Sequence, residues 1–144
     1  MSFVQTLRGF LRRLELAPWA FVSARTVPDD LLVVTGADSS HFRSLLQFLA
    51  SLRQHEPAVR CVAWDLSLTA SERVELAERF PDVELRTFDY AAVPSWFWIK
   101  VNAGCYAWKP VIVSDMVREH QGLVLWMDAG DKLTGPLDRI RRIL

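Results

Sequence analysis

The sequence predicts an α/β fold, with a mostly parallel sheet and helices on both faces. Short apolar runs that are typical of strands alternate along the chain with segments of helical period. The order strand, helix, strand, helix, strand, helix, strand requires right-handed crossovers and therefore parallel neighbours. The expected strands are residues 31–35, 59–64, 83–88 and 123–127.

Length and composition narrow the class of protein. The 144 residues suit one domain, and an apolar fraction of 51% argues against disorder. Lysine plus arginine equals aspartate plus glutamate at 17 each, so no basic excess points to nucleic acid. No apolar run approaches the roughly 20 residues of a membrane span. Cys61 and Cys105 lack the spacing of a metal or redox motif, and we expect buried, reduced thiols.

The first 24 residues carry two weaker patterns. The spacing of residues 1–16 predicts an amphipathic helix with arginines among its apolar positions. We favour a helix that packs on the domain over one that rests on an anionic membrane surface. Residues 16–24 resemble a signal-peptide core, but Glu15 and Pro18 interrupt that pattern. We therefore expect a cytoplasmic protein, with peripheral membrane contact through residues 1–16 as the alternative.

The first strand, residues 31–35, runs into a turn at 36–40 that is rich in helix-capping residues. A strand that enters a glycine turn before a helix can cradle phosphate, although a plain connection is the stronger interpretation. The helix that follows has one apolar face, formed by Phe42, Leu45, Leu46, Leu49 and Leu52. The second strand ends at Asp65, and the capping box of Thr69 and Glu72 starts the next helix.

The second half of the chain contains an irregular segment between two regular ones. Residues 83–88 alternate as a strand, and the aromatic segment 89–105 is expected to pack over the sheet edge or to line a pocket. A helix is expected over 106–117, with Pro110 in its first turn, where proline is tolerated. Five apolar residues at 123–127 predict a strand buried on both faces, and a last helix begins near residue 137.

Two carboxylates follow the last strand. Asp128 ends it, and Asp131 comes three residues later across a turn that contains Gly130. Ligands of open α/β sheets bind at the carboxyl ends of the strands, and two carboxylates there can share one Mg²⁺ or Mn²⁺ ion. The alternative is that Asp128 caps the turn and Asp131 is solvated.

In a parallel sheet these strand ends converge on one edge. Lys109 would add a point charge beside a metal-bound diphosphate, and Asp65 would accept hydrogen bonds from a ribose or a base, or else serve the turn. The three histidines, His41, His55 and His120, are expected to be exposed beside helices, which disfavours a histidine-dependent hydrolase. The candidate site residues are Thr35, Gly36, Ala37, Asp65, Lys109, Asp128 and Asp131.

Four stretches resemble those of a known family. They are VAWDLSL at 62–68, VELRTFD at 83–89, YAWKP at 106–110 and VLWMD at 124–128. Stretches like these follow one another with similar spacing in glycosyltransferase-like domains of unknown function, which are similar to nucleotide-sugar transferases of GT-A fold. The resemblance covers roughly residues 31–138.

The resemblance implies a GT-A, Rossmann-like fold and a hexosyl transfer from a UDP-sugar to an unknown acceptor. It implies that the first strand-turn and Asp65 hold the donor, and that Mn²⁺ or Mg²⁺ binds an Asp-x-Asp motif whose first member is Asp128. The chain has Gly130 where that motif has its second acid, so Asp131 would stand in.

GT-A enzymes of this type continue with an acceptor-binding half. The resemblance therefore implies one domain, 1–144, incomplete at its C-terminus, with a lead-in at 1–27 and a nucleotide-sugar-binding core at 28–144. One alternative is a non-catalytic nucleotide-binding or scaffold module, which Gly130 favours. A phosphotransferase with Asp128 as nucleophile is the weakest alternative, because such motifs normally follow the first core strand.

Overall fold

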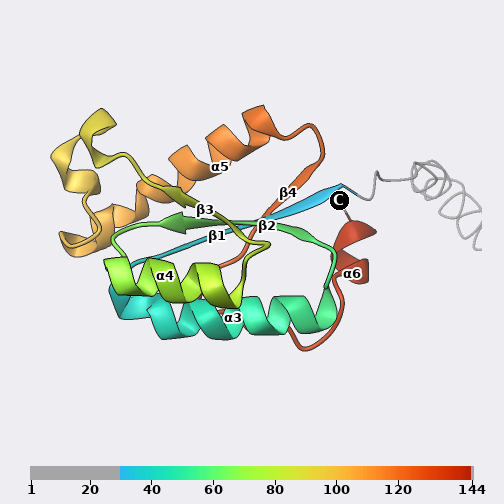
Figure 1. Ribbon diagram of the computed structural model, residues 1–144. Coiled ribbons are helices and arrows are strands. Elements are labelled where there is room, and N and C mark those ends of the chain that lie inside the picture. Colours follow the sequence, from blue (N-terminus) through green and yellow to red (C-terminus); the bar gives the residue numbers. More distant parts are fainter. Residues whose placement is uncertain (1–29, 144) are drawn as a thin grey trace, which may run out of the picture.

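The computed structural model describes residues 30–143 and confirms the α/β class. Its four strands are all parallel, in the order β3-β2-β1-β4, with helices on both faces (Figure 1). The strands are β1 (Leu31–Ala37), β2 (Arg60–Asp65), β3 (Glu84–Thr87) and β4 (Leu123–Trp126). The helices are α3 (Phe42–His55), α4 (Ala70–Arg79), α5 (Trp108–Glu119) and α6 (Asp138–Arg141).

The amphipathic helix expected at 1–16 and the signal-like stretch at 16–24 lie outside the described residues. Within residues 30–143, no helix has the length and apolar character needed to cross a membrane.

The core lies on both sides of β1, the central strand, in which all seven residues are buried. Leu31, Val33 and Ala37 belong to one apolar cluster, which α3 and α4 complete. Leu32 and Val34 point the other way, into a second cluster that includes residues of α5. Figure 1 shows the same division, with α3 and α4 on one face of the sheet and α5 on the other.

The sequence signals that predicted α3 and α4 are confirmed. The apolar stripe of α3 is buried, and Leu45, Leu49 and Leu52 are fully so. At the start of α4, Thr69 Oγ1 accepts a hydrogen bond from the backbone N–H of Glu72 at 3.3 Å. The Glu72 carboxylate in turn accepts one from the backbone N–H of Thr69 at 2.8 Å, which completes the capping box.

Three sequence expectations about burial are wrong. The four residues of β4 are half-buried rather than buried on both faces, because β4 pairs only with β1 in the described sheet. Cys61 is buried, and burial raises the pKa of its thiol to about 12, but Cys105 is exposed. His120 is buried, and its Nε2 lies 2.9 Å from the carbonyl oxygen of Asp30.

The segment after β4 packs back against α3. Leu133 and Leu137 are buried in the first core cluster, and Ser51 Oγ accepts a hydrogen bond from the backbone N–H of Leu133 at 3.0 Å. Glu56, at the end of α3, binds Arg141 of α6 through both carboxylate oxygens, at 2.8 and 2.7 Å. These contacts hold α6 at the end of the sheet where the strands begin (Figure 1).

Candidate functional site at the carboxyl rim

The carboxyl ends of three adjacent strands each deliver an aspartate to the same edge of the sheet. Asp38 follows β1, Asp65 ends β2, and Asp128 lies two residues beyond β4. Because β1 pairs with both β2 and β4 in parallel, these three residues emerge from neighbouring strands. We call this edge, together with residues 89–109 that pass over it, the carboxyl rim.

Thr35, Gly36 and Ala37 all lie within β1 and are buried, so the strand continues two residues beyond its expected end at Thr35. Contact of these residues with a donor stays a prediction. Gly36 is closely packed within the strand. A Cβ there would lie 3.3 Å from Leu66 and 3.4 Å from the Trp126 ring. The chain therefore leaves the sheet at Asp38, which sequence analysis did not single out.

Three polar side chains contact the carboxylate of Asp38. Its Oδ1 accepts a hydrogen bond from Ser40 Oγ at 2.6 Å and lies 2.9 Å from His41 Nδ1, and its Oδ2 lies 3.1 Å from Lys100 Nζ. Burial opposes ionisation of Asp38, but the hydrogen bonds from Ser40, His41 and Lys100 outweigh it and hold its pKa well below the usual range. Asp38 is therefore a fixed negative charge at the end of the central strand.

Asp65 is engaged within its own loop. Its Oδ1 accepts hydrogen bonds from the backbone N–H groups of Ser67 and Leu68 at 2.9 and 2.6 Å. Its Oδ2 lies 2.5 Å from Arg73 Nε, and its side chain is 1% exposed. This geometry agrees with the interpretation in which Asp65 stabilises the turn after β2. Contact of Asp65 with a donor stays a prediction.

The structure brings together the other three candidates. Lys109, in the first turn of α5, places its Nζ 2.7 Å from Asp128 Oδ1, and Trp126 Nε1 donates to the same oxygen at 2.7 Å. Asp131 Oδ2 accepts a hydrogen bond from the backbone N–H of Asp128 at 3.1 Å, which closes the turn. The hydrogen bonds from Lys109 and, secondarily, from Trp126 lower the pKa of Asp128, whose side chain is 61% exposed.

Aromatic rings surround the Lys109 ammonium. Its Nζ lies 5.2 Å from the ring centre of Trp126 and 5.9 Å from those of Tyr106 and Trp108. Trp108 is itself fixed by a hydrogen bond from its Nε1 to the carbonyl oxygen of Ala103 at 3.0 Å. Distances within about 6 Å allow cation–π attraction, so the rings hold the ammonium beside Asp128.

The aromatic segment over the rim contains an unusual backbone turn. All five residues Asn102–Tyr106 have positive φ, and the helix predicted from residue 106 begins at Trp108 instead. Gly104 is required within this turn, because a Cβ there would lie 2.1 Å from the carbonyl oxygen of Phe97. Trp96 and Trp98 of the same segment remain about half exposed.

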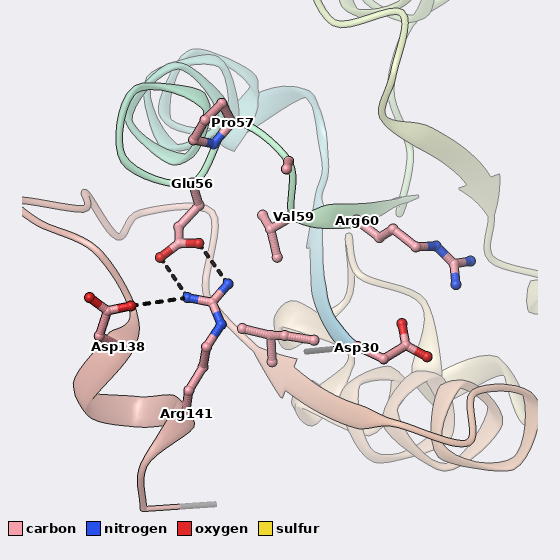
Figure 2. A pocket seen from close by; sticks show the side chains of 9 residues that line it. Asp30, Glu56, Pro57, Val59, Arg60, Asp138 and Arg141 are labelled. Carbon is pink, nitrogen blue, oxygen red and sulfur yellow. Dashed lines mark hydrogen bonds and ion pairs between the residues drawn. The ribbon is translucent and has the colours of Figure 1, made fainter. Parts of the chain in front are cut away.

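A cavity of about 500 Å³ lies at the opposite end of the strands. Figure 2 shows its walls, where Arg141 reaches from α6 to Glu56 and where Asp30 and Arg60 line the other side. None of the candidate site residues lines this cavity. The rim and the cavity are therefore separate features of the domain.

The fold and the rim define a Rossmann-like α/β domain with charged side chains at the carboxyl ends of its parallel strands. The chain belongs to the DUF1647 family, which is described as a protein of unknown function and whose sequence model matches residues 14–114.

One solved structure that the chain is similar to is the crystal structure of S. aureus TarS 1-349, with a TM-score of 0.46 and 14% sequence identity. The match covers 72% of this chain and 28% of that one, so the chain spans under a third of the TarS structure. Comparison with curated proteins gives no match.

Proposed function

We propose that this domain binds a nucleoside-diphosphate sugar, with a UDP-sugar as the first candidate, at the carboxyl rim. In this proposal it is the donor-binding part of a hexosyltransferase that transfers the sugar to an unidentified acceptor. The observation that carries the proposal is the contact of Lys109 with Asp128 at the end of β4, beside the end of β1. Parallel α/β sheets bind ligands at such strand ends, and the resemblance of the four motifs supports the same assignment.

We assign the residues of the carboxyl rim different roles in the proposed donor binding. Lys109 and Lys100 are the two lysines that contact rim carboxylates, and Lys109 is the one proposed to contact the diphosphate. Asp65 holds the loop after β2 through Ser67 and Leu68, so its proposed contribution to donor binding is to position that loop. The buried residues 35–37 support Asp38 from within the strand.

A divalent cation is part of the proposal. The described residues contain no group of three or more histidine, cysteine, aspartate or glutamate side chains arranged for a metal. Mg²⁺ sites commonly need only one or two carboxylates, because waters and substrate phosphates complete the coordination. Asp128 and Asp131 fit that kind of site, and Asp128 already accepts a cation, the Lys109 ammonium. Bound Mg²⁺ or Mn²⁺ would neutralise a leaving diphosphate.

Isothermal titration calorimetry with UDP and UDP-sugars in the presence of Mn²⁺ tests the proposal. We expect binding by the wild-type chain and at least tenfold weaker binding by Asp128→Asn. Asp115→Asn is the matched control, because it makes the same change of charge on α5, where Asp115 contacts Arg118 rather than the rim. No heat with any UDP-sugar from a folded sample, or equal loss in both variants, would contradict the proposal.

A second candidate is a module that binds the nucleotide without transferring a sugar. Two observations favour it: Gly130 stands where Asp-x-Asp motifs have an acid, and Lys109 occupies an oxygen of Asp128. This candidate predicts that UDP raises the melting temperature of the chain while no UDP-sugar is hydrolysed or consumed with Mn²⁺ present. Release of UDP from a UDP-sugar that is lost in Asp128→Asn would favour the transferase.

A further inference from the structure

We propose that Lys109 is a built-in competitor for the divalent cation at Asp128. In this proposal the ammonium and the ion bind the same carboxylate in turn, and arrival of the ion releases Lys109 toward the diphosphate. The inference rests on the proposed function, because it concerns the same ion and the same nucleotide.

The first support is where the ammonium lies. Lys109 Nζ is 2.7 Å from Asp128 Oδ1, which also accepts the indole N–H of Trp126 at 2.7 Å. Two donors therefore already occupy Oδ1, so an ion on this atom would displace them, and an ion on Oδ2 would lie beside the ammonium and be repelled by it. The turn after β4 adds only one further carboxylate, that of Asp131, so an ion there depends strongly on Asp128.

The second support is the environment that keeps the ammonium in place. The rings of Tyr106, Trp108 and Trp126 lie within 6 Å of Nζ, and the Lys109 side chain is 31% exposed. Each ring attracts the cation, and partial burial limits the exchange of Lys109 with water. The ammonium is therefore held at this exposed carboxylate by three rings as well as by the ion pair.

The third support is the charge balance. Lys109 and Lys132 bring two positive charges to the turn, and Asp128 and Asp131 bring two negative ones, so the turn has no net positive charge to attract a diphosphate. A divalent cation on the carboxylates makes the local charge positive and at the same time frees the lysine. Ion binding and nucleotide binding are then coupled, so each strengthens the other.

The test is a titration of Mn²⁺ alone into the full chain, with free Mn²⁺ measured by electron paramagnetic resonance. Lys109→Gln removes the competitor, and we expect it to bind Mn²⁺ about tenfold more tightly than the wild type. Lys132→Gln is the matched control, because it removes the same charge one residue from Asp131, where no contact with Asp128 exists. We expect at most a twofold change in that control.

A second measurement separates competition from a general structural role. With Mn²⁺ present, Lys109→Gln should weaken UDP binding although it strengthens Mn²⁺ binding, whereas a misfolded variant would lose both. The near-ultraviolet circular dichroism of the aromatic cluster reports whether the fold persists.

The outcomes distinguish this inference from the proposed function. If Lys109→Gln and Lys132→Gln strengthen Mn²⁺ binding equally, the competition is overturned. It is also overturned if Lys109→Gln weakens Mn²⁺ binding. If the wild type and Lys109→Gln bind Mn²⁺ with equal affinity, and Asp128→Asn abolishes binding, the inference fails while the proposed metal site stands. If no variant binds Mn²⁺, the inference fails together with the proposed ion, and UDP binding without metal then tests what remains of the proposed function.

Discussion

The carboxylate of Asp65 lies 2.5 Å from the guanidinium Nε of Arg73, across the loop that joins β2 to α4. The same carboxylate accepts two backbone hydrogen bonds from that loop, and its side chain is buried. An acid at a strand end is therefore not by itself a ligand-binding residue. Here it stabilises the loop, which in turn contacts the β1–α3 connection through Ser39 and Ser67.

Asp65→Asn is expected to destabilise the fold. The substitution keeps one oxygen for the two backbone donors, but it replaces the oxygen that faces Arg73 with an amide group and removes the charge. Buried hydrogen bonds to charged groups contribute about 1.5 to 3 kcal/mol each. Urea denaturation should show a loss of that order in the free energy of unfolding. A stable Asp65→Asn variant that has lost only UDP binding would instead make Asp65 a direct ligand contact.

The contact of Glu56 with Arg141 predicts a pH dependence of stability. The Arg141 guanidinium, with the Leu137 backbone N–H, outweighs burial and holds the pKa of Glu56 below its usual value. Because the folded pKa is below the unfolded value of about 4.3, the stabilisation is complete above that pH. It is lost as the pH falls through the folded pKa.

Thermal denaturation of wild type and Glu56→Gln across pH 3 to 7 measures this contribution. We expect the variant to melt at a lower temperature at pH 7, and the two curves to converge toward pH 3. Asp138→Asn is the control, since Asp138 is exposed and lies 3.9 Å from Arg141. A difference between wild type and Glu56→Gln that is independent of pH would contradict an ionic role.

Two glycines should respond oppositely to alanine. Gly104 has φ +60°, and a Cβ there meets the carbonyl oxygen of Phe97, so Gly104→Ala should cost at least about 1 to 2 kcal/mol of stability. A Cβ at Gly130 meets nothing within 4 Å, so Gly130→Ala should be neutral or stabilise by up to about 1 kcal/mol. Chemical denaturation of both variants checks this pair, and similar losses would contradict the described backbone.

The periodicity of the chain was sufficient to predict the order of the regular elements. The apolar stripe of α3 and the capping box of α4 depend on neighbouring residues only, so their signal is complete in the sequence. The end of β1 was misplaced because glycine normally indicates a turn. Gly36 instead stays in the strand, where a Cβ would lie 3.3 Å from the Leu66 side chain and 3.4 Å from the ring of Trp126, 90 residues away.

The site was predictable in part. Lys109 beside Asp128 followed from the helix and strand assignments, since both lie at the same edge of a parallel sheet. The left-handed turn of Asn102–Tyr106, which places Tyr106 and Trp108 around Lys109, was not. Most residues in that turn are not glycine, and L-residues rarely adopt positive φ, so only Gly104 and Asn102 carried a signal. Asp38 could have been found from its place before the two serines that begin the next helical turn.

The most direct test of the proposed site is a nuclear magnetic resonance titration of the ¹⁵N-labelled chain with UDP in the presence of Mg²⁺. Trp126 Nε1 donates to Asp128, so its indole signal reports on the rim, while the amide of Val59 reports on the cavity at the other end of the strands. We expect the Trp126 indole and Asp128 amide signals to move with saturation and the Val59 signal to stay unchanged. Shifts confined to Val59 and its neighbours, or no shift at millimolar UDP, would contradict it.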